Sequence, residues 1–77
     1  MKLKLSQLEI GKSATVNFVA GEGKIRRRLF DMGITPGTEV FVRKKAPLGD
    51  PIEITLRGYE VALRKTEASI VTVEEIQ

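Results

Sequence analysis

The feature that most constrains the fold is IEITLRGYEVALRK, residues 52–65, where apolar and polar side chains alternate on both sides of a glycine. Such alternation is typical of two half-buried strands joined by a tight turn. If Gly58 and Tyr59 form a two-residue type II′ loop, Leu56 lies opposite Val61 across the hairpin. The same register pairs Ile54 with Leu63, Arg57 with Glu60 and Glu53 with Arg64. The sequence therefore predicts a hairpin with one apolar face and one charged face.

Three further segments are short, apolar and bounded by turn residues, as strands are: residues 13–19, 39–45 and 69–73. Alternation predicts which side chains face the core and which face outward. The predicted inward residues of the first two segments are Ala14, Val16, Phe18, Val40 and Val42. Phe41 and Arg43 are predicted to point outward. The apolar residues before these strands, predicted to form a lead-in segment that caps the core, are Leu3, Leu5, Leu8 and Ile10.

One helix is predicted inside this β sequence, at residues 24–32. Ile25, Leu29 and Met32 recur at spacings of four and three residues, which gives a single apolar stripe that can pack on the sheet. Gly33 follows as a left-handed C-terminal cap.

Residues 35–38, Thr-Pro-Gly-Thr, then have the composition of a type II turn leading into the next strand. Together these elements predict a mainly β fold, a small closed SH3-like β-barrel of about five strands with one short inserted α-helix at residues 24–32. A chain of 77 residues is expected to form a single domain, residues 1–77.

Composition excludes most enzyme classes. The chain has no cysteine and no histidine, so thiolate catalysis and sulfur-ligated metals are excluded, and the commonest base and the commonest nitrogen ligand are missing. Its carboxylates form no paired acid and base and no set of oxygen ligands at loop spacing. We therefore expect no enzymatic activity, no cofactor and no tight metal site. With no apolar stretch of membrane-spanning length and no signal-peptide pattern, a cytoplasmic location is expected.

The glycines near residue 23 resemble parts of phosphate-binding loops but fit neither motif. Aligning Gly23-Lys24 with the Walker pattern places Phe18 at the first glycine and Ile25 at the hydroxyl position. The dinucleotide fingerprint would require a third glycine at Arg26. The simpler interpretation is that these glycines let the chain leave a strand and begin the helix.

Basic residues gather in the middle of the chain, where residues 24–45 hold seven basic against two acidic groups, while residues 46–77 hold three against six. Arg26, Arg27 and Arg28 fan around the predicted helix, because successive residues turn by about 100°. A solvated face is the favoured interpretation, and no nucleic acid partner is expected. The alternative is an RNA-binding module whose further phosphate contacts are Lys24, Arg43, Lys44 and Lys45.

Phe30 is predicted to lie on the side of the helix away from the apolar stripe, between Arg26 and Arg27. Two outcomes are open at this point: the lead-in segment covers Phe30, or the ring anchors a protein partner together with the arginines. Outward Phe41 and the APLGDP loop, which carries Leu48, could extend such a surface. The candidate partner-binding residues are Arg26, Arg27, Phe30, Phe41 and Leu48.

Three stretches in order, RRRLFDMGITPGTEV, APLGDPIEI and LRGYEVALRKTEASIV, resemble the FeoA family of small cytoplasmic accessory proteins of bacterial ferrous-iron uptake. The similarity extends from Leu5 to about Val73. It implies an SH3-like barrel with an inserted helix, no catalytic residues, and a role in supporting or regulating the FeoB membrane transporter, whose cytosolic part has a GTPase domain. The resulting hypothesis is an accessory protein that docks on that cytosolic part and reaches the membrane only through it, with self-association as a further possibility.

Overall fold

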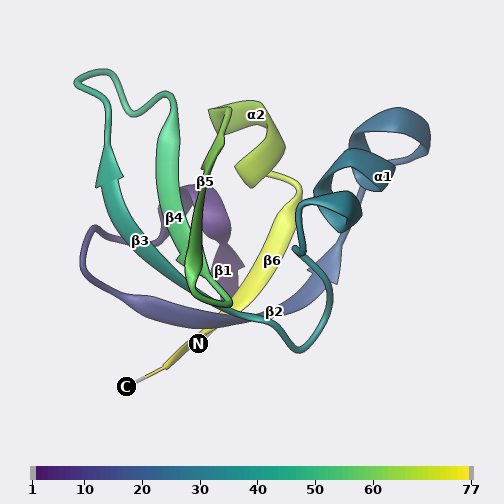
Figure 1. The fold of residues 1–77 in the computed structure, drawn as a ribbon, viewed down its shortest axis with the longest axis horizontal. Helices are drawn as coiled ribbons and strands as arrows, with labels where there is room; N and C mark the ends of the chain where they lie inside the picture. The colour runs from purple at the N-terminus through teal and green to yellow at the C-terminus, as the bar shows by residue number, and fades with distance from the viewer. Residues whose placement is uncertain (1, 77) are drawn as a thin grey trace.

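Six antiparallel strands form one strongly curled sheet in the computed structural model, which describes residues 2–76 (Figure 1). The strands are β1 (Lys2–Lys4), β2 (Ser13–Val19), β3 (Glu39–Lys45), β4 (Ile52–Leu56), β5 (Tyr59–Leu63) and β6 (Val71–Ile76). The helices are α1 (Gly23–Asp31) and the short α2 (Lys65–Ala68), and a 3-10 turn, η1, spans Leu5–Gln7. This confirms the predicted small β-barrel with one inserted helix, with six strands in place of five.

The sixth strand comes from the lead-in segment. β1 pairs with β6, so that Leu3 lies opposite Val73, and the strand order is β1-β6-β2-β3-β4-β5. Leu5 and Leu8 are fully buried and cap the core as predicted, whereas Ile10 is exposed. The last strand begins at Val71, later than predicted, because residues 65–68 form α2 first.

The β4–β5 hairpin forms, but its register differs from the prediction by two residues. Leu56 pairs with Tyr59 and Ile54 with Val61, so the turn residues are Arg57 and Gly58. Both have positive φ, 49° and 83°, which is the geometry of a type I′ turn. A shift of two residues keeps every side chain on its predicted face, since side chains in a strand alternate with period two.

β2 contains a β-bulge that reverses part of the predicted alternation. Its pairing with β6 is regular up to Val16 and resumes at Phe18, with Asn17 as the extra residue. After the bulge the inward position falls to Val19, which is buried, and Phe18 points outward with 58% of its surface exposed. The prediction that Phe18 faces the core is therefore wrong, because one inserted residue exchanges the two faces of a strand.

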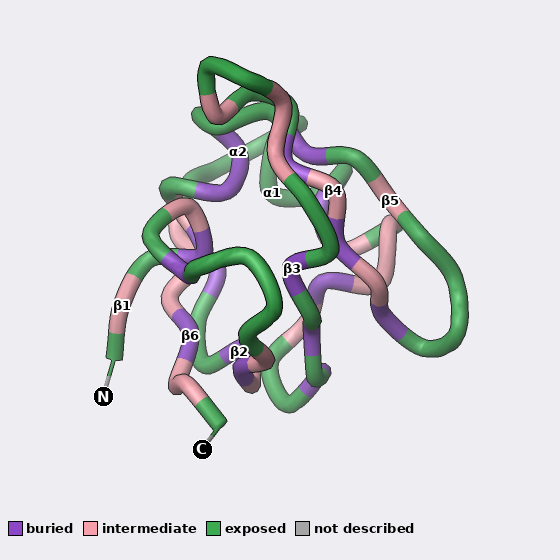
Figure 2. Tube along the Cα trace, turned by 90° about the vertical axis from the view of Figure 1, so that its left-hand side faces the viewer, coloured by how far each residue is buried: buried purple, intermediate pink, exposed green. Residues whose placement is uncertain are grey.

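The core lies inside the curl of the sheet, where buried residues of every strand except β1 meet (Figure 2). From α1 only Leu29 is fully buried, and Met32 and Phe30 pack against the core from its edge. Ile25, predicted to share the buried stripe, is 36% exposed. Beyond the helix Gly33 has the predicted positive φ of 97° and Gly37 has one of 93°, as the cap and the type II turn require.

Candidate partner-binding surface

α1 projects from one side of the barrel and leaves most of its surface open (Figure 1). Of its nine residues, only Leu29 is fully buried. A helix this short is not stable in isolation, so contacts with the barrel must hold it in place. Those contacts come from Leu29 and Phe30, which pack on the core, and from two of the three arginines.

Arg26 is fixed in two ways. Its Nε–H donates a hydrogen bond to the carbonyl oxygen of Val19, 3.2 Å away, and its guanidinium carbon lies 4.4 Å from the centre of the Phe30 ring. Phe30 is half-buried and packs against the core beneath this guanidinium. The lead-in segment packs instead on α2 and β6. The Phe30 ring is therefore an anchored, partly exposed surface with a cation stacked on it.

Arg28 ties α1 to α2. Its Nη1 lies 3.5 Å from Oε2 of Glu67, a carboxylate with only 6% of its side chain exposed. The other oxygen of Glu67 accepts a hydrogen bond from the backbone N–H of Arg64 at 2.9 Å. A buried carboxylate needs such partners, because an unpaired buried charge is strongly destabilising. Arg28 thus serves the fold, a role that the spacing of the arginines did not indicate.

Arg27 and Lys24 differ from their neighbours. Both are exposed, and within residues 2–76 neither side chain takes part in a hydrogen bond or ion pair. Arg27 borders a hollow of about 440 Å³ whose other lining residues are Gly23, Arg26, Phe30 and Asp31. Three of the predicted partner-binding residues, Arg26, Arg27 and Phe30, therefore meet at one concave surface on α1, which we call the α1 hollow.

All three basic residues of β3 have partners within the chain, and two of them pair with carboxylates. Arg43 pairs with Glu60 at 3.1 Å and with Glu53 at 3.4 Å, and Lys44 lies 3.6 Å from Glu53. The ammonium group of Lys45 donates to the carbonyl oxygen of Ser6. The basic middle third is thus divided into a strand whose basic side chains all have partners and a helix in which two basic side chains have none among the described residues.

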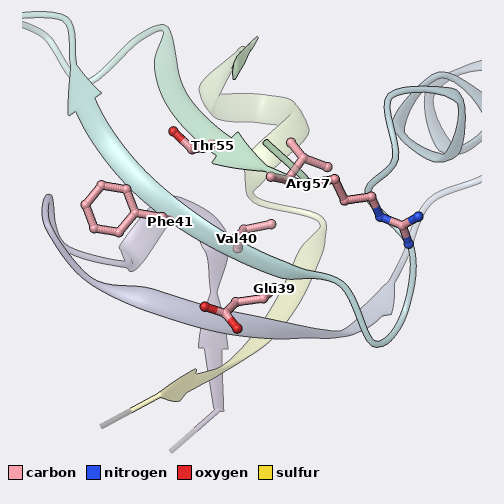
Figure 3. A pocket seen from close by; sticks show the side chains of 6 residues that line it. Glu39, Val40, Phe41, Thr55 and Arg57 are labelled. Carbon is pink, nitrogen blue, oxygen red and sulfur yellow. The ribbon is translucent and has the colours of Figure 1, made fainter. Parts of the chain in front are cut away.

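Phe41 and Leu48 lie apart from the α1 hollow. Phe41 is 38% exposed on the outer face of β3, at one end of a shallow hollow of about 230 Å³ that ends at Arg57 (Figure 3). Leu48 is 91% exposed in the loop that joins β3 to β4, and this loop lies on the opposite side of the barrel from α1 (Figure 1). The five predicted residues therefore do not form one continuous surface.

The described residues offer little for other chemistry. Among residues 2–76 no three His, Cys, Asp or Glu side chains gather into a group that could hold a metal ion. Neither α1 nor α2 has the length and apolar composition needed to cross a bilayer.

The geometry so far defines a small β-barrel domain with a projecting basic helix, the class to which solved SH3-like proteins of bacteria belong. The FeoA of Stenotrophomonas maltophilia, described as a prokaryotic SH3-domain protein and solved with zinc, is 34% identical with a TM-score of 0.81. That alignment covers 94% of this chain and 89% of the other. A FeoA-like protein from Clostridium acetobutylicum is 43% identical, with a TM-score of 0.91 over 99% of this chain and 88% of that one.

Residues 3–75 match the family model of the FeoA domain, so this chain belongs to the FeoA family. A curated relative, the Fe(2+) transport protein A/Fe(2+) transporter FeoB fusion protein of Porphyromonas gingivalis, is 36% identical over 74 residues. The match covers 96% of this chain and 9% of that relative, so this chain spans less than a tenth of the fusion protein's length. In that relative the FeoA-like part and the transporter share one polypeptide.

Proposed function

We propose that this protein is a non-enzymatic, cytoplasmic accessory protein of ferrous-iron transport that binds the cytosolic part of a FeoB-type transporter. The observation that carries the proposal is the fusion relative, in which a sequence 36% identical to this one is joined to FeoB. A covalent link keeps two domains at high effective concentration, which is useful when the separate proteins must associate.

The α1 hollow is the surface proposed for this contact. It combines a half-buried aromatic ring with a stacked, immobilised arginine, and such residue types dominate binding energy at protein interfaces. Because Arg26 is already held by Val19 and Phe30, little side-chain freedom would be lost when a partner binds. Phe41 and Leu48 remain proposed contacts at separate places on the barrel, which a large partner would have to reach independently.

The experiment is a calorimetric titration of the transporter's isolated cytosolic domain with this protein and with two phenylalanine variants. Phe30→Ala is expected to weaken binding by about thirtyfold, a loss of ~2 kcal/mol, because it removes the aromatic floor of the α1 hollow. Phe18→Ala is the matched control, since Phe18 is exposed on β2, and we expect it to bind as the unchanged protein does.

Circular dichroism and thermal unfolding verify that Phe30→Ala is folded before its affinity is measured. Equal affinity of folded Phe30→Ala and the unchanged protein would exclude the α1 hollow as the contact. The absence of any binding by the unchanged protein would contradict the proposed function itself.

A further inference from the structure

Only some of the basic side chains of α1 make hydrogen bonds or ion pairs within the described residues. Four of its residues are basic: Lys24, Arg26, Arg27 and Arg28. Arg26 and Arg28 have partners within the chain, whereas Lys24 and Arg27 have none among the described residues. These two are three positions apart and so lie on neighbouring turns of one face, where like charges repel each other. No contact among the described residues shows these two cations stabilising the fold.

The α1 hollow also contains hydrogen-bond donors without acceptors. The Nε–H of Arg26 is taken by Val19, but the outer nitrogens of that guanidinium make no hydrogen bond or ion pair within residues 2–76. Gly23 borders the hollow, and the first turn of α1 receives no side-chain cap from Glu22. The N-terminus of α1 is the positive end of the helix dipole, so it adds to the positive potential that Arg26 and Arg27 create in the hollow.

These features favour carboxylates over a nucleic acid backbone as the binding partner. Arg26 lies over one face of the Phe30 ring, so a base cannot stack on that face. Asp31 also lines the hollow, one helical turn beyond Arg27, and its charge opposes any anion beside it. A continuous run of phosphates would have to pass Asp31, whereas a single carboxylate needs to reach only Arg27. Arg43 and Lys44 of β3, which could extend a phosphate track, are already paired with carboxylates. A planar guanidinium matches a carboxylate with two parallel hydrogen bonds, while Phe30 provides an apolar floor beside it.

We propose that the α1 hollow recognises an acidic segment of its protein partner, with one carboxylate pairing to Arg27 in the hollow and a neighbouring one to Lys24, which lies outside the hollow on the preceding turn. An adjoining apolar side chain of the partner rests on the Phe30–Arg26 pair. This inference rests on the proposed function, because the partner is the cytosolic part of the transporter. It specifies the chemistry of the partner surface, which the proposed function leaves open.

The test measures binding of the transporter's cytosolic domain by the unchanged protein, by Arg27→Glu and by Lys12→Glu at several salt concentrations. Lys12→Glu makes the same change of charge at an exposed residue outside α1. Arg27→Glu is expected to weaken binding by about tenfold or more at low salt, while Lys12→Glu stays within about twofold of the unchanged protein. The affinity of the unchanged protein should also fall as salt rises, and more steeply than that of Arg27→Glu.

A charge exchange identifies the partner's carboxylate. Single Asp→Arg and Glu→Arg variants of the cytosolic domain are tested against Arg27→Glu, and at least one is expected to restore most of the lost affinity. If the domain binds all three proteins equally and independently of salt, the inference is wrong and the proposed function stands. If the domain binds none of them, both are wrong.

Two further results would overturn the inference while explaining the surface differently. Arg27→Glu could alter the sedimentation of this protein alone and leave its affinity for the cytosolic domain unchanged, which would make a second copy the occupant. Arg27→Glu could instead abolish salt-sensitive retention on polyuridylate without affecting the transporter domain, which would make the occupant a nucleic acid.

Discussion

At the scale of single residues, the junction between α1 and the β4–β5 hairpin depends on a glycine. The hydroxyl of Tyr59 donates a hydrogen bond to the carbonyl oxygen of Met32, at the C-terminal end of the helix. Gly33 follows at once with a φ of 97°, and a β-carbon there would lie 2.6 Å from the Tyr59 hydroxyl oxygen and 3.0 Å from Leu56 Cδ1. Gly33 is therefore required for its conformation and for the space beside it.

We expect Gly33→Ala to lower the free energy of unfolding by about 3 kcal/mol, of which ~1–2 kcal/mol is the left-handed backbone and the rest is the crowding at Tyr59 and Leu56. Gly37→Ala is the matched control, since Gly37 has a φ of 93° with nothing within 4 Å of an added β-carbon. That variant should lose only the backbone part, ~1–2 kcal/mol. Urea unfolding followed by circular dichroism measures both, and equal losses would show that the Tyr59 contact does not matter.

Glu67 illustrates a residue whose importance the sequence did not reveal. Nothing in KTEA suggests a buried carboxylate, yet Glu67 is only 5% exposed and holds both Arg28 and the N–H of Arg64. Glu67 lies three positions after Arg64, so that capping contact is local and could have been anticipated from a glutamate at the third position of a helix. The contact with Arg28 could not, because the two residues are far apart in the sequence.

At the scale of elements, the bulge in β2 decides which aromatic side chain reaches the solvent. Strand alternation correctly assigned Ala14 and Val16 to the core and Val40 and Val42 beside them, but it failed beyond Asn17. A bulge depends on how two strands fit across a ladder, so one strand's own alternation does not disclose it.

Because of the bulge, we expect two neighbouring substitutions to change the free energy of unfolding by very different amounts. Phe18→Thr should change the free energy of unfolding by less than about 0.5 kcal/mol, because the side chain is exposed. Val19→Thr should lower it by ~2 kcal/mol, because it buries a hydroxyl in the core. Chemical denaturation of both variants measures the difference, and a larger loss from Phe18→Thr than from Val19→Thr would contradict the observed register.

The sequence correctly predicted a hairpin of β4 and β5 with its apolar face toward the core, but the turn lies one residue earlier than predicted and is of type I′ instead of type II′. The apolar faces remain correct because Ile54 and Val61 stay on the core side in either register. The turn falls at Arg57-Gly58, where Arg57 accepts a positive φ of 49° and donates a hydrogen bond to the hydroxyl of buried Thr38. That contact comes from another part of the chain and compensates for a residue that turns of this type rarely use.

At the scale of the whole molecule, the charged side chains of the surface fall into two groups. Some form ion pairs within the chain, and others have no partner among the described residues. The long outer face of β3 to β5 carries the network formed by Arg43, Lys44, Glu53 and Glu60, while the unpaired cations of α1 lie on the projecting side. Net charge alone could not show this division, since it counts paired and unpaired groups equally.

This division predicts that the cations of β3 contribute little to any affinity of the protein for RNA. Replacing Lys44 and Lys45 together by alanine should leave retention on polyuridylate unchanged within about twofold, because both side chains already have partners in the chain. The measurement is fluorescence anisotropy of labelled polyuridylate at several salt concentrations. A large loss of affinity in this double variant, with a reduced salt dependence, would support the RNA-binding alternative.

The sequence predicted which residues of α1 belong to the candidate site, but it did not predict what each of them contacts. Arg26, Arg27 and Phe30 were identified from residue type and helical spacing, and they do meet at one hollow. Which arginine is free depends on Val19 and Glu67, which lie outside the helix. Phe41 and Leu48 were grouped with them only because each was expected to be exposed, and exposure does not bring residues together.

The sequence by itself determined five of the six strands and most of their faces, the helix after residue 22, the left-handed glycines and the absence of cysteine and histidine. Each of these follows from signals that act within a few residues, namely side-chain alternation, turn propensity and composition. Only the tertiary structure decided the bulge at Asn17 and the partners of Arg26, Arg28 and Arg43. It also decided that Arg27 has no hydrogen bond or ion pair among the described residues. Those outcomes depend on which distant residues the curled sheet brings within hydrogen-bond distance, and a local pattern carries no information about them.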